Sequence, residues 1–136
     1  GVTQKAYVMG YTLDDQGEAI PGCVYSIPDN VQGACFHDGY IYLSQSAGFF
    51  PGHVLAYRLE DHKQCGTRKV LDAEVPVYML TEHNASKITT VPPMNEEITV
   101  VGDQMYLLFE AASNRYMVGK MLGLEQVYGA PVAYFH

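Results

Sequence analysis

The sequence predicts an all-β protein built from β-propeller blades, and three observations lead to this prediction. The chain of 136 residues contains 11 tyrosines and 5 phenylalanines but no tryptophan, and tyrosine suits half-buried strand positions where the ring packs and the hydroxyl reaches water. Short runs rich in tyrosine and valine alternate with glycine, proline, aspartate and asparagine, which is typical of strands joined by turns. Some of these runs also recur along the chain, as expected for a repeat architecture.

The clearest repeat is a pair of segments, 32–43 and 96–107, related by a constant offset of 64 residues (96 − 32). Their residues align as follows: Phe36 with Val100, Ile41 with Met105, Tyr42 with Tyr106 and Leu43 with Leu107. Asp38-Gly39 in one segment coincides with Gly102-Asp103 in the other. Because two-residue turns of this type need positive φ and match the strand twist, each segment is predicted to be a β-hairpin.

A third and a fourth strand are expected to complete each four-stranded unit. The expected third strands are residues 8–14, 54–60 at an offset of 46 (54 − 8), and, more loosely, 117–122. The expected fourth strands are residues 24–27, 77–80 and 132–135. A proline directly precedes two of these fourth strands, and a proline at a strand start costs no ladder hydrogen bond. The one candidate for a helix, around residues 110–124, is interrupted by two glycines.

The order of these strands divides the chain into blades. A single all-β unit over residues 1–136 is expected, made of a partial blade at 1–30, a blade at 31–90 and a blade at 91–136. About two and a half blades cannot close a ring. The remainder of the same propeller is therefore expected as a partner, in a companion chain or in a precursor that is proteolytically processed. The competing prediction is a self-contained β-sandwich of about ten strands.

Charge and hydropathy exclude two classes of partner. The formal net charge is −7, from 8 basic and 15 acidic side chains. No nucleic-acid partner is expected, because a phosphate-binding surface needs clustered lysine and arginine. No apolar run approaches the roughly 20 residues that a membrane helix needs, so no membrane span is expected.

The cysteines and one short triplet bear on the compartment of the protein. Cys23, Cys35 and Cys65 are odd in number and include no Cys-x-x-Cys pair, which argues against a zinc site. One disulfide with a free thiol, a bond to another chain, and three unpaired thiols all remain open. Asn84-Ala85-Ser86 is an acceptor triplet, so Asn84 is a candidate glycosylation site if the protein is secreted by a eukaryote.

Four short segments form a further pattern: VQGACF at 31–36, LSQSAG at 43–48, PPMNEEI at 92–98 and LFEAASNRY at 108–116. This pattern resembles one in uncharacterised secreted bacterial proteins that look propeller-like and are longer than this chain. It covers roughly residues 6–118. The resemblance implies a secreted or extracytoplasmic location and a position in the C-terminal part of such a protein, but no particular activity. Glu97 stands where that pattern usually has glycine.

The strongest candidate site combines two residues that share one repeat position. Gln32 and Glu96 lie at the entry to the strand that would line the central channel of a propeller. Together with Glu97, they offer oxygen ligands for a hard cation such as Ca²⁺. Glu96 or Glu97 could instead be a catalytic general base. Alternatively, Gln32 and Glu96 hydrogen-bond backbone groups between blades.

Two further groups of side chains are weaker candidates. Glu110, with Arg115 close behind it, could face a ligand or form a surface ion pair. The loop containing Phe49 and Phe50 could pack across its own blade or contact a partner.

Three functions remain open from the sequence. The first is a binding or structural propeller portion that associates with the rest of its precursor or another chain, and that presents a ligand or metal site in the channel. The second is a hydrolase or lyase with its active site in that channel. The third is a subunit of an extracellular assembly whose neighbours supply the missing blades.

Overall fold

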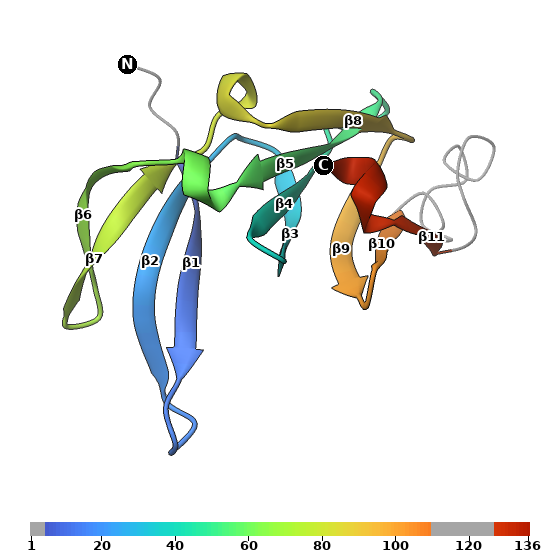
Figure 1. The fold of residues 1–136 in the computed structure, drawn as a ribbon. Helices are drawn as coiled ribbons and strands as arrows, with labels where there is room; N and C mark the ends of the chain where they lie inside the picture. Colours follow the sequence, from blue (N-terminus) through green and yellow to red (C-terminus); the bar gives the residue numbers. More distant parts are fainter. Residues whose placement is uncertain (1–4, 110–126) are drawn as a thin grey trace. The chain divides into compact units, whose positions relative to one another are not determined.

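The computed structural model of the chain describes residues 5–109 and 127–136 (Figure 1). The strands in this part are β1 (Ala6–Leu13), β2 (Ala19–Ile27), β3 (Val31–His37), β4 (Tyr40–Gln45), β5 (Gly52–Arg58), β6 (Gln64–Val70), β7 (Ala73–Met79), β8 (Lys87–Val91), β9 (Asn95–Val101), β10 (Gln104–Phe109) and β11 (Tyr128–Pro131). Three short 3₁₀ helices accompany them: η1 (Leu59–Asp61), η2 (Glu82–Asn84) and η4 (Val132–Phe135). The predicted all-β class is confirmed. The helix candidate at 110–124 and the expected strand at 117–122 lie outside the described residues.

The chain forms two compact units. Gly1–Asp29 with Glu60–Thr81 makes one unit, and Asn30–Leu59 with Glu82–His136 makes the other. The division into segments 1–30, 31–90 and 91–136 stays a prediction. Residues 60–81, however, group with the N-terminal segment. No helical segment in the described ranges is long and apolar enough to cross a bilayer.

The first unit is one sheet with the strand order β1-β2-β7-β6. β2 and β7 run parallel, with Val24 opposite Val77 and Tyr25 opposite Tyr78, and the two tyrosine rings stack at a centroid distance of 5.5 Å. The prediction that residues 77–80 form the fourth strand of the second blade is therefore wrong. The two similar Val-Tyr segments are instead neighbouring strands of one sheet, where like residues lie opposite each other.

The second unit contains two sheets, ordered β3-β4-β5-β8 and β11-β10-β9. The two predicted hairpins are confirmed, and their registers agree at the offset of 64 (99 − 35), since Cys35 pairs with Tyr42 and Thr99 with Tyr106. In the first turn Asp38 and Gly39 have φ of 46° and 77°, and in the second Gly102 has φ of 59°. These positive values are those that two-residue hairpin turns require.

The third strand of the repeat also recurs, as β1 and β5. Val8 pairs with Tyr25 in the β1–β2 ladder, as Val54 pairs with Thr89 in the β5–β8 ladder. β1 and β5 are related by the offset of 46 residues (54 − 8), and each pairs antiparallel with a later strand, β2 and β8 respectively. β8, rather than residues 77–80, thus pairs with β5, and the β6–β7 hairpin lies between β5 and β8 in the sequence.

The end of the described chain departs from the prediction in a similar way. The prediction of a fourth strand at 132–135 is wrong, because these residues form the 3₁₀ helix η4. The preceding strand, β11, pairs with β10, with Gly129 opposite Tyr106. β5 pairs with β4 in the same manner, with Ala56 opposite Tyr42. β11 therefore occupies the place of a third strand.

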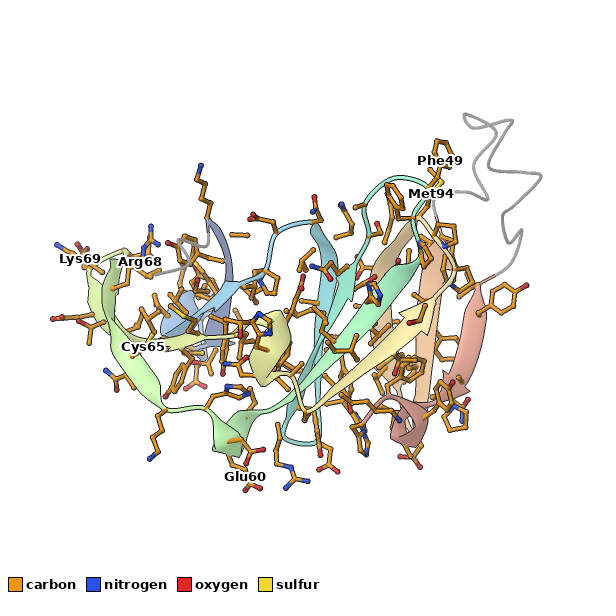
Figure 2. The ribbon with its side chains drawn as sticks, turned by 90° about the horizontal axis from the view of Figure 1, so that it is seen from above. Phe49, Glu60, Cys65, Arg68, Lys69 and Met94 are labelled. Atoms are coloured by element: carbon orange, nitrogen blue, oxygen red, sulfur yellow. The ribbon has the colours of Figure 1, made fainter. Side chains whose placement is uncertain are left out.

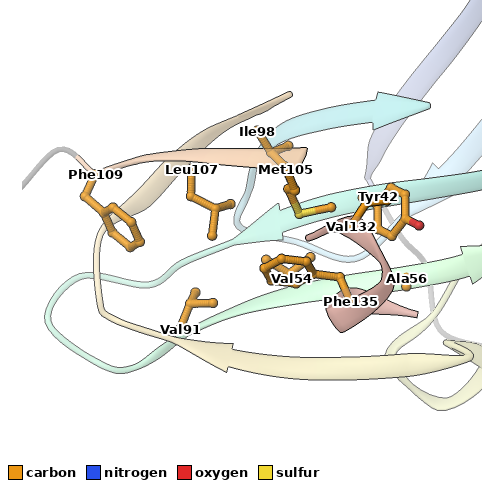
Figure 3. Close-up of a cluster of buried hydrophobic side chains, with 10 residues drawn as sticks. All are labelled: Tyr42, Val54, Ala56, Val91, Ile98, Met105, Leu107, Phe109, Val132 and Phe135. Atoms are coloured by element: carbon orange, nitrogen blue, oxygen red, sulfur yellow. The ribbon is translucent and has the colours of Figure 1, made fainter. Parts of the chain in front are cut away.

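An apolar core lies between the two sheets of the second unit, and Figure 3 shows its side chains pointing toward one another. Its buried members are Tyr42, Val54, Ala56, Val91, Ile98, Met105, Leu107, Phe109, Val132 and Phe135. They come from β4, β5 and β8 of one sheet, from β9 and β10 of the other, and from η4. Burying one such large aliphatic or aromatic side chain stabilises a fold by about 1.5–3 kcal/mol.

At the edge of this core, strands β3 and β9 approach each other closely. A Cβ atom placed on Gly33 would lie 2.6 Å from the carbonyl oxygen of Glu96 and 3.1 Å from the nitrogen of Ile98. Both neighbours are backbone atoms, so neither can rotate away. Glycine at position 33 is required by this close approach of the two strands rather than by its φ angle.

We predict that Gly33→Ala destabilises the chain by about 1–3 kcal/mol, because the added methyl group must push the β9 backbone away. Urea denaturation followed by circular dichroism measures this loss. Gly66→Ala is the matched control, since Gly66 is also a strand glycine but a Cβ atom placed on it would meet no other atom within 4 Å. Equal stability losses in the two variants would contradict the close approach of β3 and β9.

Candidate functional site

The predicted channel site lies along the seam between β3 and β9. Because Gly33 faces the backbone of Glu96 and Glu97, the strand segments that carry Gln32 and Glu96 lie side by side; a shared site at these two residues stays a prediction. The side chains of Gln32 and Glu97 are exposed, and that of Glu96 is half-buried. Glu110 lies outside the described residues.

One carboxylate of this seam, that of Glu97, is already hydrogen-bonded within the chain. The Oε1 atom of Glu97 accepts a hydrogen bond of 3.0 Å from the backbone N–H of Ile98, on the side of β9 that faces Gly33. Among the described residues, no group of three or more histidine, cysteine, aspartate or glutamate side chains is arranged to hold a metal ion. Ca²⁺ binding by Gln32 and Glu96, and a general-base role for Glu96 or Glu97, stay predictions.

Cys35 lies in β3 beside this seam and packs against the core. Burial raises the pKa of its thiol to about 11, and the nearby Glu97 carboxylate acts in the same direction. A thiol with so high a pKa is a poor nucleophile at neutral pH. Cys23, Cys35 and Cys65 are all free thiols, and Cys65 is exposed on β6 (Figure 2).

A buried polar group that the sequence did not predict lies at the start of β9. The side chain of Asn95 is fully buried, and its Nδ2 donates hydrogen bonds to Ser44 Oγ at 2.6 Å and to the carbonyl oxygen of His53 at 3.3 Å. A Cβ atom on Gly52 would overlap the Asn95 side chain. The amide thus fills a space that the neighbouring sheet leaves open by having glycine at the first residue of β5.

Two signals in the sequence point to this amide in retrospect. Ser44 is a polar residue directly after the apolar run of β4, and Gly52 begins the next strand. Ser44 lacks the sequence context that is usual for a catalytic serine. The structure shows instead that Ser44 accepts a hydrogen bond across the interface between the two sheets.

A cavity of about 360 Å³ opens at the hairpin-turn end of the two sheets. It is lined by His37, Asp38, Asp103, Gln104, Pro131, Val132, Ala133 and His136. The ring of His136 stacks on that of Tyr40 with their centroids 4.6 Å apart. The Nδ1 atom of His136 lies 2.7 Å from the Tyr42 hydroxyl oxygen. Two carboxylates and two imidazoles at one cavity suit a polar or cationic small ligand better than an anionic one.

The remaining candidate residues lie at the surface of the second unit. Asn84, the last residue of η2, is exposed, while Ser86 of the same triplet donates its hydroxyl to the backbone carbonyl of Ala56 at 2.8 Å. Phe49 and Phe50 are 58% and 76% exposed in the loop between β4 and β5; Figure 2 labels Phe49. Both aromatic rings are therefore exposed rather than packed across the sheet, and contact of this loop with a partner stays a prediction.

Comparison of the chain with models of protein families, with curated proteins and with solved structures gives no match.

We predict that Asn95→Ala lowers the free energy of unfolding by about 2–3 kcal/mol, because it leaves the Ser44 hydroxyl and the His53 carbonyl without their buried donor. A double-mutant cycle with Ser44→Ala, measured by urea denaturation, is expected to give a coupling energy above about 0.5 kcal/mol. Thr99→Ala, at an exposed position of β9, serves as the control and is expected to change little. Additive losses in the cycle would show that the two side chains do not interact.

We predict that iodoacetamide modifies Cys65 before Cys35 in the native protein at pH 8. Cys35 is half-buried and has a pKa of about 11, so only about one molecule in a thousand carries its thiolate at that pH. Raising the pH from 8 to 10 should accelerate the reaction of Cys35 by nearly two orders of magnitude, since the thiolate fraction rises toward the pKa. Peptide mass spectrometry measures both rates. Equal rates at pH 8 would contradict the burial of Cys35.

Proposed function

We propose that this chain is a portion of a β-propeller that acts as a binding or scaffolding module and associates with further blades of its ring. The observation that carries the proposal is the agreement of strand registers between the two hairpins at a single offset of 64 residues (99 − 35). A sandwich does not require four-stranded units to recur with the same register, whereas a propeller is built from them.

The way in which the two sheets of the second unit stack also supports a propeller. Met105 and Leu107 of β10 point into the shared core. Their equivalents in β4, Ile41 and Leu43, are also buried but lie on the opposite face from Tyr42, because side chains alternate along a strand. Tyr42 itself points into the core. Equivalent sheets therefore stack front to back, as blades do around an axis.

Front-to-back stacking leaves one face of the sheet β11-β10-β9 uncovered in the described chain. Tyr106 is the equivalent of the fully buried Tyr42, yet it is 38% exposed. Leu108, on the same face, is 45% exposed, and Val101 is also exposed. The ring of Tyr106 lies over Gly129, as expected for a tyrosine opposite a small residue. This apolar face is where the proposal places the next blade.

We predict that Leu108→Glu raises the dissociation constant for association of the chain through this face by about tenfold or more. The reason is that burying a carboxylate without a partner costs more than about 1.4 kcal/mol. Sedimentation equilibrium over a range of concentrations measures the association. Phe50→Glu is the matched control, because it places the same charge on an exposed apolar residue outside this face and is expected to leave association unchanged.

Protein isolated from the natural source should contain the rest of the ring. Native mass spectrometry of that material should show either a longer chain or a companion chain that completes the ring. A chain of 136 residues that stays monomeric at high concentration, unfolds cooperatively and is unaffected by Leu108→Glu would overturn the proposed function.

A further inference from the structure

β1 is an edge strand of the first unit, and it lacks the features that keep edge strands from pairing. It pairs with β2 on one side, and no strand pairs with its other side within the described chain. Its eight residues, AYVMGYTL, include no charge and no proline. The irregularity in its ladder places the extra residue, Gly22, in β2, so β1 itself is not bulged. Such an edge is a ready template for another strand.

The other edge strands of the described chain are either protected against pairing with a further strand or already in contact with a neighbouring strand. β6, at the opposite edge of the same sheet, carries Arg68 and Lys69 (Figure 2). β8 is five residues long and contains Lys87. β9 carries two glutamates, β11 is four residues long and ends in Pro131, and β3 is approached by the β9 backbone at Gly33. Charges, proline and short length are the usual devices that block edge pairing. β1 itself has no charge, no proline and no short length; the Arg68 guanidinium lies over its Tyr7 ring, 4.3 Å from the ring centroid.

The repeat assigns a partner position to this edge. β1 corresponds to β5 at the offset of 46 (54 − 8), where valine, tyrosine and leucine recur at the same spacing, and each strand pairs antiparallel with a later one, β2 or β8. On its other side, β5 pairs with β4, with Leu55 opposite Leu43. The free edge of β1 is therefore the equivalent of the β5 edge that β4 occupies.

We propose that the free edge of β1 accepts an antiparallel strand from a β-hairpin of the β3–β4 or β9–β10 type, in the register that β4 adopts on β5. Met9, equivalent to Leu55, would then lie opposite a leucine. Gly10, equivalent to Ala56, would lie opposite a tyrosine, as Ala56 lies opposite Tyr42. This inference rests on the repeat in the proposed function. It goes further by naming the strand that is paired, the edge that is used and the register of the pairing.

The chemistry of the incoming strand follows from the two hairpins already present. β4 contains Ile41-Tyr42-Leu43 and β10 contains Met105-Tyr106-Leu107. In both, the tyrosine lies opposite a small residue of the third strand, which is Ala56 in one sheet and Gly129 in the other. The expected occupant is an apolar hairpin with an aliphatic–Tyr–Leu strand, and its backbone supplies the hydrogen bonds.

The test fuses the sequence of residues 95–109, which contains no cysteine, to the N-terminus of the full chain through a flexible linker of about ten Gly and Ser residues. The linker keeps the hairpin at high effective concentration near β1. Hydrogen exchange is then measured residue by residue. The alternate β1 amides that face away from β2 should exchange about tenfold more slowly, or slower still, in the fusion than in the unfused chain.

The control is the same fusion with proline in place of the tyrosine of the fused hairpin, which removes a backbone donor without altering β1. Protection of β1 that disappears in this control supports the pairing. Unchanged β1 exchange in the first fusion overturns it. Protection of β1 that instead grows with concentration in the unfused chain assigns the edge to a second copy, and also overturns it. The Leu108→Glu measurement concerns a different face, so either proposal can fail without the other.

Discussion

Asn95 reaches from the first residue of β9 into the neighbouring sheet, where its amide bonds Ser44 and the carbonyl of His53. Apolar side chains fill the space between the sheets of the second unit, but apolar contacts alone tolerate small shifts of one sheet over the other. A buried amide does not, because each displaced hydrogen bond leaves a desolvated polar group. Asn95 therefore sets where β9 lies on the sheet β3-β4-β5-β8, and Gly33 allows β3 and β9 to come as close as that position requires.

The same interface shows how repeated units become different from one another. Ser44 corresponds to Leu108 at the repeat offset of 64 (108 − 44), and Gly33 corresponds to Glu97 (97 − 33). The third sheet thus lacks both the hydroxyl and the glycine that receive Asn95 and β9 in the second. In the proposed propeller, a sheet that covered the exposed face of Tyr106 and Leu108 would meet a more apolar surface and the Glu97 carboxylate of β9. Such a difference between the two interfaces would help to specify which sheet packs on which.

The first unit adds a feature that a plain four-stranded repeat does not have. The β6–β7 hairpin leaves the chain between β5 and β8 and joins the sheet of β1 and β2 through the parallel β2–β7 pair. It gives that sheet one charged, protected edge at β6. The opposite edge strand, β1, has no charged residue of its own. The sheet is therefore asymmetric, with one side closed to pairing and the other suited to it.

The sequence by itself determined the strand class, the two hairpins and their register. These features are local, because a two-residue turn with positive φ joins strands whose side chains alternate within a few residues of it. The sequence also paired Gln32 with Glu96; the strands that carry them are neighbours in the structure, and a shared site there stays a prediction. Only the tertiary structure decided that residues 77–80 pair with β2 rather than with β5. Strands 77–80 and 87–91 both suit a sheet, and the choice between them depends on partners far away in the chain. It likewise decided that residues 132–135 coil over the core as η4, and that Asn95 is buried. A polar residue after a proline pair has the composition of a loop, and its burial depends on a hydroxyl and a glycine that lie more than 40 residues away.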